Sequence, residues 1–204
     1  MACTVNGRIV PVLTVESADD AERACEAILA GGLASVEITF RTAAAPEAIR
    51  RAVKLDGLEV GAGTVLTSMQ LDAAVEAGAA FAVAPSTSAT MVRAAQSVGI
   101  EFIPGAATAT EIDQARALGC RLVKLFPAAL IGGPAFVRAV SPVFPDLRFV
   151  PTGGINLDNL AEYLRLPSVA ACGGTWICEP ALIRDGRFDE VERRAREASA
   201  LTLT

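Results

Sequence analysis

Hydrophobic and polar residues follow two alternating patterns along the chain. From Arg8 onward, short runs rich in β-branched residues alternate with longer alanine-rich stretches that carry a helical period. This alternation is typical of βα units that build a parallel sheet. The pattern predicts eight strands, at Ile9–Leu13, Ser35–Phe40, Leu58–Ala62, Ala80–Ala84, Glu101–Ile103, Arg121–Phe126, Arg148–Pro151 and Ser168–Cys172.

Helices are predicted between these strands and after the last one. They are Ala18–Ala30, Pro46–Lys54, Ser68–Ala77, Thr87–Val98, Ala109–Leu118, Pro134–Val140, Leu157–Leu164 and Phe188–Leu201. Four helices are expected to end at glycines that precede a strand, Gly31, Gly78, Gly99 and Gly119. Eight such units favour an α/β fold of the (β/α)8 TIM barrel type, as a single domain over residues 1–204. An open doubly wound sheet fits part of the same pattern.

Composition excludes several classes of function. Hydrophobic residues make up 52% of the sequence and charged residues 20%, as in ordinary globular proteins. The net charge of -5 gives no basic surface for nucleic acid. The stretch Ala77–Val92 is too short and polar to span a bilayer, and Met1–Asn6 lacks the features of a signal peptide. We therefore expect a cytoplasmic protein with neither nucleic acid nor membrane as a partner.

The rare amino acids narrow the chemistry further. The sequence has no histidine, so the commonest general base and the commonest metal ligand are both missing, which excludes triad hydrolases and metalloenzymes with histidine ligands. Lysine occurs only at Lys54 and Lys124. The cysteines are odd in number and scattered, which predicts reduced thiols, and they are Cys3, Cys25, Cys120, Cys172 and Cys178.

Lys124 is the first candidate for chemistry. Period-two alternation places it with Leu122 and Phe126 on one face of a strand, the face that points inward in a closed barrel. An apolar lumen disfavours the ammonium form, so the free amine becomes available to attack a carbonyl. The structural alternative is an ammonium that reaches the strand end and pairs with a carboxylate. Lys54, at a predicted helix end, is interpreted as a solvated charge.

Glu37 shares a strand face with Thr39 and Arg41. A carboxylate in the lumen needs a partner, which is either Lys124, as a proton relay, or Arg41, as a structural ion pair. Arg41, at the strand's carboxyl end, offers a planar guanidinium that suits a substrate carboxylate. A surface ion pair explains Arg41 equally well.

Glycine-rich segments follow the last two predicted strands. Gly153–Gly154 and Gly173–Thr175 stand where barrel enzymes bind phosphate, because glycine lets backbone N–H groups approach an anion. Tight βα turns also need glycine, so each segment alone is weak evidence.

Four ordered motifs are more specific than any single residue. They are GGLASVEITFRT at residues 31–42, GAGTVL at 61–66, VKLFPA at 123–128 and VPTGGI at 150–155. With them, the chain closely resembles the bacterial 2-keto-3-deoxy-6-phosphogluconate (KDPG) aldolase and 4-hydroxy-2-oxoglutarate aldolase family, from VPVLTV at residues 10–15 to GGTW at 173–176.

The resemblance implies a role for each matching residue. It makes Lys124 the Schiff-base lysine and Glu37 the general acid and base of a class I aldolase. It implies that Arg41 and Thr64 bind the substrate carboxylate and that Phe126 packs beside bound pyruvate. The other implied substrate-binding positions are Pro85, Thr152, Gly153, Gly154, Gly173, Gly174 and Thr175. The resemblance also implies a homotrimer that needs neither a metal nor a cofactor and acts on a phosphorylated keto acid.

The chain differs from the family pattern at two places, and the sequence is compatible with several other functions. Family members often carry serine where this chain has Thr175, and the APSTS loop at residues 84–88 replaces a commoner proline-glycine version. The same chemistry on the galactonate epimer or on 4-hydroxy-2-oxoglutarate fits the sequence. A phosphate-binding barrel isomerase or synthase that uses Glu37 and Lys124 without a covalent bond also fits, as does a non-catalytic phosphosugar-binding module.

Overall fold

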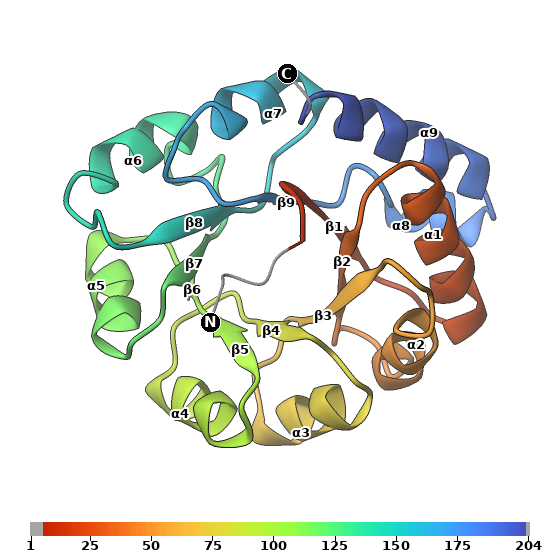
Figure 1. The fold of residues 1–204 in the computed structure, drawn as a ribbon, viewed down its shortest axis with the longest axis horizontal. Coiled ribbons are helices and arrows are strands. Elements are labelled where there is room, and N and C mark those ends of the chain that lie inside the picture. Colours follow the sequence, from red (N-terminus) through yellow and green to blue (C-terminus); the bar gives the residue numbers. More distant parts are fainter. Residues whose placement is uncertain (1–5, 203–204) are drawn as a thin grey trace.

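Strands and helices alternate along the chain and form a ring of strands inside a ring of helices (Figure 1). The computed structural model describes residues 6–202. All strand pairs in the described ladders are parallel. The strands are β1 Ile9–Leu13, β2 Ser35–Thr39, β3 Glu59–Gly63, β4 Phe81–Val83, β5 Glu101–Ile103, β6 Gly105–Ala106, β7 Leu122–Leu125, β8 Arg148–Pro151 and β9 Cys172–Gly174.

The ring consists of two hydrogen-bonded arcs rather than one continuous sheet. One arc has the order β5-β4-β3-β2-β1-β9 and the other β6-β7-β8. Only Pro104, which has no N–H to donate, separates β5 from β6 along the chain. Between β8 and β9, Phe149 N–H donates to the Ser168 carbonyl at 2.8 Å, and Thr152 forms an isolated bridge with Gly173. The predicted α/β barrel topology is confirmed, with a ladder that is interrupted at these two places.

The helices lie outside the strands and agree with the prediction to within two residues at each end (Figure 1). They are α1 Ala18–Ala30, α2 Ala45–Ala52, α3 Ser68–Glu76, α4 Ala89–Val98, α5 Ala109–Ala117, α6 Gly133–Val140, α7 Leu157–Leu164, α8 Pro180–Arg184 and α9 Phe188–Ala200. The five-residue helix α8 was not predicted, because it is too short to show a period. None of the helices in the described part of the chain is long and apolar enough to cross a membrane.

The last strand was predicted in the wrong place. Ser168–Cys172 was expected, but the ladder with β1 pairs Ile9 with Cys172 and Pro11 with Gly174. Pairing with a neighbouring strand therefore decides this element, since its alanine and glycine residues carry little strand preference of their own. As a result Gly173 and Gly174 lie within β9 and not in the loop after it.

The glycine at the end of α1 also differs from the prediction in detail. Gly31 caps the helix in a right-handed conformation, and the left-handed residue is Gly32, with φ of 87°. A side chain at Gly31 would meet the Ala195 Cβ of α9 at 2.4 Å. Gly31 is therefore explained by close packing between α1 and α9. Gly99 closes α4 in the left-handed region, as predicted.

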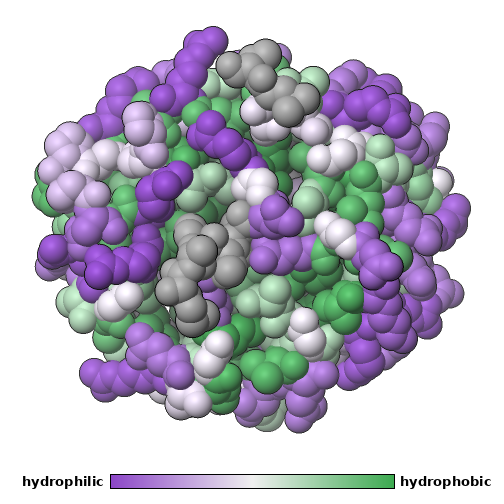
Figure 2. Space-filling model, viewed as in Figure 1, coloured by the Kyte–Doolittle hydropathy of each residue, from purple (hydrophilic) through white to green (hydrophobic). Residues whose placement is uncertain are grey.

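The buried hydrophobic residues form two separate cores, and the smaller one shows which side chains point into the ring. The larger core fills the space between strands and helices, and hydrophilic side chains gather over the outer helices on the face in Figure 2. The smaller core lies inside the ring and consists of Val10, Phe81, Val83, Ile103, Leu122, Val150 and Ala171. These seven residues mark the strand face that points into the lumen.

Candidate functional site: a lysine and a glutamate in the lumen

Lys124 and Glu37 meet inside the ring. The Lys124 Nζ donates to Glu37 Oε1 at 3.0 Å and to Oε2 at 3.1 Å. The two residues are only 5% and 4% exposed. The partner of Glu37 is therefore Lys124 and not Arg41. The sequence also allowed a purely structural role, in which the Lys124 ammonium pairs with a carboxylate at the strand end. The ion pair is present, but it lies deep in the lumen.

The residues around Lys124 and Glu37 are small or apolar. Lys124 is paired with Gly105 of β6 and Val150 of β8 in the ladder, and Glu37 with Gly61 of β3. The Phe126 ring centre lies 5.8 Å from the Lys124 Nζ, within the range of a cation–π contact. Charged groups this deep are costly unless they are paired, so the two-pronged contact compensates both.

Glycine makes the room that the Glu37 carboxylate occupies. A Cβ at Gly63 would lie 2.2 Å from Glu37 Oε1. Gly63 pairs with Thr39, the residue two positions beyond Glu37 on β2. The sequence did not predict this role for Gly63, which appeared there only as part of the GAGTVL motif.

Arg41 and Thr64 follow β2 and β3 at the carboxyl end of the ring. Arg41 is exposed, and no ion pair or hydrogen bond joins its guanidinium to another of residues 6–202. Thr64 has φ of 57°, and it is the one non-glycine residue with positive φ in the described range. A β-branched residue in this region is strained by about 1–3 kcal/mol, and such strain gathers at functional sites. Because β2 and β3 are paired, Arg41 and Thr64 lie just beyond neighbouring strands at the same end of the ring.

The loop after β8 has a backbone that requires glycine. Gly153 and Gly154 have φ of 97° and 75°. A Cβ at Gly154 would lie 2.4 Å from the Ala129 Cβ, so this loop packs against the segment that follows β7. The Asn159 side chain donates to the Gly154 carbonyl at 2.9 Å, which ties the loop to the first turn of α7. Backbone N–H groups beside a helix N-terminus favour an anion.

The end of β9 lies next to this loop. Thr152, 5% exposed, forms a bridge with Gly173, where a Cβ would lie 2.4 Å from Thr152 Oγ1. A Cβ at Gly174 would lie 1.9 Å from the ring of Trp176, and Thr175 is exposed just beyond it. The two glycine segments therefore lie side by side, although one belongs to a strand.

Pro85 is the last predicted position and follows β4. A Cβ at Gly105 would lie 2.2 Å from the Pro85 carbonyl carbon, so Pro85 packs directly over β6. Because Gly105 pairs with Lys124, Pro85 belongs to the same mouth of the ring. The half-buried Phe126, just beyond the strand that carries the lysine, and the half-buried Pro85, packed over the adjacent β6, thus lie at the same end of the ring.

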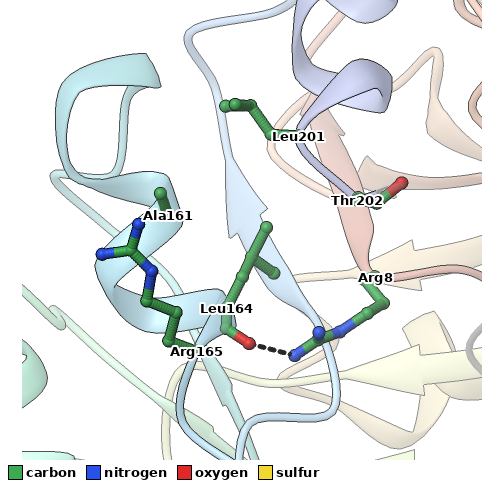
Figure 3. Close-up of a pocket in the computed structure, with 6 residues that line it drawn as sticks. All are labelled: Arg8, Ala161, Leu164, Arg165, Leu201 and Thr202. Carbon is green, nitrogen blue, oxygen red and sulfur yellow. Dashed lines mark hydrogen bonds between the residues drawn. The ribbon is translucent and has the colours of Figure 1, made fainter. Parts of the chain in front are cut away.

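A cavity of about 320 Å³ lies at the opposite end of the ring (Figure 3). Its lining residues are Arg8, Ala161, Leu164, Arg165, Leu201 and Thr202. The Arg8 guanidinium donates to the Leu164 carbonyl at 2.6 Å, which satisfies an acceptor at the end of α7. The Arg165 guanidinium points away from that of Arg8 in Figure 3. Because the two cations do not converge, Arg8 is explained by its structural contact.

The described residues hold no group of three or more His, Cys, Asp or Glu side chains that could bind a metal. Hydroxyl groups also lie at the carboxyl end of the ring. Two of these, on Thr14 and Thr39, were not singled out in the sequence as site residues. Alternation from Val10 through Val12 to Thr14 is the signal that could have found the first of them.

These elements together define a parallel α/β barrel with a buried lysine–carboxylate pair and glycine-rich segments at its carboxyl end. The chain belongs to the KDPG and KHG aldolase family, whose model matches residues 2–194.

Individual relatives agree with this assignment. The chain is 45% identical, over 94% of its length and 87% of the relative's, to the 2-dehydro-3-deoxy-phosphogluconate aldolase of Pseudomonas aeruginosa. The 2-keto-3-deoxy-6-phosphogluconate aldolase of Zymomonas mobilis ZM4, crystallised with 3-phosphoglycerate, superposes with a TM-score of 0.89 at 38% identity, covering 95% of this chain and 91% of that one. The KDPG aldolase of Legionella pneumophila, with pyruvate captured as a covalent carbinolamine, gives a TM-score of 0.88 at 36% identity, covering 96% and 94%.

Proposed function

We propose that this chain is a class I aldolase that cleaves 2-keto-3-deoxy-6-phosphogluconate into pyruvate and glyceraldehyde 3-phosphate. The observation that carries the proposal is the direct contact between the Lys124 Nζ and the Glu37 carboxylate inside the lumen, at 3.0 and 3.1 Å. A nucleophile and a base within hydrogen-bond reach of each other are the minimal machinery of Schiff-base chemistry. The carbinolamine in the Legionella pneumophila relative is an intermediate of this chemistry.

The reaction begins with a proton transfer. When the substrate enters, the Lys124 ammonium gives a proton to Glu37, and the free amine attacks the C2 ketone. One proton moves from the attacking nitrogen to the ketone oxygen, which gives a carbinolamine. Glu37 then protonates the carbinolamine hydroxyl, and loss of water leaves an iminium. Glu37, again a carboxylate, takes the proton of the C4 hydroxyl as the C3–C4 bond breaks, and the bond electrons move to the iminium nitrogen.

The remaining steps restore the enzyme. Cleavage releases the aldehyde and leaves a pyruvate enamine on Lys124. Glu37 returns its proton to C3, and water hydrolyses the new iminium to pyruvate and the Lys124 ammonium, the state in which the cycle began. Each proton is handled by a group that already contacts the reacting nitrogen in the structure, which is the geometric requirement for general acid–base catalysis.

Anchors at both ends of the substrate would hold the reacting centre in place. Arg41 and Thr64 are assigned to the carboxylate, and Phe126 and Pro85 to the walls around the keto carbon. Thr152 lies between the lysine and the two glycine segments. The phosphate is assigned to those segments, Gly153, Gly154, Gly173, Gly174 and Thr175.

The same machinery accepts close variants of the substrate. The family's description includes KHG aldolases, so 4-hydroxy-2-oxoglutarate is the favoured second substrate. It lacks the phosphate and would not use the glycine segments. The cytoplasmic location, the single domain and the homotrimer stay predictions.

Trapping with borohydride tests the proposal. Pyruvate and borohydride are expected to reduce an iminium to a stable adduct, which peptide mass mapping would place on Lys124. Lys124→Arg should form no adduct and lose turnover. Lys54→Arg, which removes the other lysine of the chain, is the matched control and should keep both. The absence of an adduct on Lys124 in the wild type would instead support an isomerase or synthase that forms no covalent bond to its substrate.

A further inference from the structure

Two threonine hydroxyls contact each other at the carboxyl end of the lumen. The Oγ1 atoms of Thr14 and Thr39 lie 2.8 Å apart, and either can be the donor. Thr39 is 1% exposed, whereas Thr14 is half-buried. No role in the reaction described above accounts for this pair.

Both side chains point into the lumen. Val10 belongs to the core inside the ring, so alternation along β1 directs Val12 and Thr14 to the same side. On β2, Glu37 reaches Lys124 across the lumen, and Thr39 shares its face. Val12 pairs with Glu37 in the ladder. The threonine pair therefore lies one layer above the catalytic glutamate, toward the carboxyl end.

Hydrogen counting leaves one donor over. Two hydroxyls carry two hydrogens, and their mutual contact uses one. Within residues 6–202 neither hydroxyl has a further hydrogen-bond acceptor. Thr42, just beyond the same strand, is different, because its hydroxyl donates to the Val15 carbonyl at 2.6 Å. Thr14 is the more exposed of the two. When the Thr39 hydroxyl donates to the Thr14 oxygen, the Thr14 hydrogen is free to donate to a ligand in the lumen.

We propose that the Thr14–Thr39 pair donates this hydrogen bond to the carboxylate of the keto acid. This inference rests on the proposed function. The strand order is Glu37, Thr39, Arg41, so the pair stands between the group that serves the C2 carbon and the guanidinium assigned to the carboxylate. In a 2-keto acid the carboxylate carbon is bonded to C2, so it falls within this interval. Thr39, which is fully covered, is a positioning residue that orients the Thr14 hydroxyl.

Exchange of the pyruvate methyl protons with deuterium isolates this contact. The exchange needs the Schiff base and the carboxylate anchor, but involves neither the C4 hydroxyl nor the phosphate. Thr14→Val keeps the side-chain volume and removes the hydroxyl. We expect the KM for pyruvate to rise roughly tenfold, the usual effect of losing one hydrogen bond to a charged group, with kcat changed less than threefold. Thr14→Ser should restore the KM.

Thr42→Val is the matched control, because it removes a neighbouring hydroxyl that contacts only backbone. Its KM for pyruvate should stay that of the wild type. Thr39→Val tests the relay from the covered side and should raise the KM in the same way, which keeps the proposal testable should Thr14→Val not fold.

Two results would overturn the inference. An unchanged KM for pyruvate in Thr14→Val would do so, as would a defect confined to cleavage of the sugar acid, which would place the hydroxyl on the C4 side instead. Failure of the proposed function looks different, since the wild type itself would then show neither proton exchange nor a borohydride adduct.

Discussion

At the scale of single residues, the site depends as much on missing side chains as on charged ones. Alternation along two strands is enough to predict that Glu37 and Lys124 face the lumen, because the period of a strand fixes every second side chain. It does not predict their bidentate contact, which depends on strands 87 residues apart in sequence. The space for Glu37 is made by Gly63, whose missing Cβ would lie 2.2 Å from the carboxylate.

Gly63→Ala is therefore expected to reduce catalysis. The added methyl group must displace the Glu37 carboxylate from Lys124, and misplacing a catalytic group by about 1 Å costs roughly a hundredfold in rate. Steady-state cleavage assays measure the loss of kcat. Gly57→Ala is the control, since a Cβ there meets nothing within 4 Å although φ is 87°. That variant should lose about 1 kcal/mol of stability and keep its kcat. Equal kcat in both variants would show that Gly63 is not needed for the pair.

At the scale of elements, helices were easier to predict than the last strand. Helix starts carry local signals, such as the Thr67–Gln70 and Thr108–Glu111 capping boxes that open α3 and α5. The strand β9 carries no such signal, because its residues are Cys172, Gly173 and Gly174 and their register is set by β1. The error placed two site glycines in a loop. Local sequence could not reveal this, since strand pairing is a long-range interaction.

Thr108→Ala tests the energy of one of these helix caps. The Thr108 hydroxyl accepts from the Glu111 N–H, and the Glu111 carboxylate accepts from the Ala107 and Thr108 N–H groups, so three backbone donors at the start of α5 are satisfied. We expect the free energy of unfolding to fall by about 1 kcal/mol, as for other N-cap replacements, with kcat unchanged. Urea denaturation measures the loss. The control is Thr110→Ala on the same turn, which removes an exposed threonine that does not cap the helix. A comparable loss in the control would contradict the capping explanation.

At the scale of the whole molecule, closing the ring is what assembles the site. Each strand contributes few polar groups, and only their arrangement around one lumen brings Glu37 of β2 to Lys124 of β7. The family motifs identified this arrangement from sequence, whereas periodicity alone left an open sheet as an alternative. The same closure buries several thiols completely, including Cys25 and Cys178, both 0% exposed. Cys3, also predicted to be a reduced thiol, lies outside the described residues.

The buried thiols make the stability of the fold depend on pH. Burial, the largest cause, raises the pKa of Cys25 from 9.0 to about 12, and it raises that of Cys172 to about 12 as well. Below pH 9 the thiols are protonated in both states and do not disfavour folding. Above it, the unfolded chain releases protons that the native chain retains, so stability falls as the pH rises toward 12. Near pH 10.5, roughly 2 kcal/mol is lost for each such thiol.

Urea unfolding under reducing conditions, at pH 8 and about pH 10.5, measures this loss in the wild type and in Cys25→Ala. The variant is less stable at pH 8 because the replacement leaves a small cavity. It should nevertheless lose about 2 kcal/mol less than the wild type on going to the higher pH, because one ionising thiol is gone. An equal loss in both proteins would mean that Cys25 already ionises normally in the native state. That result would contradict its complete burial between the strands and the helices.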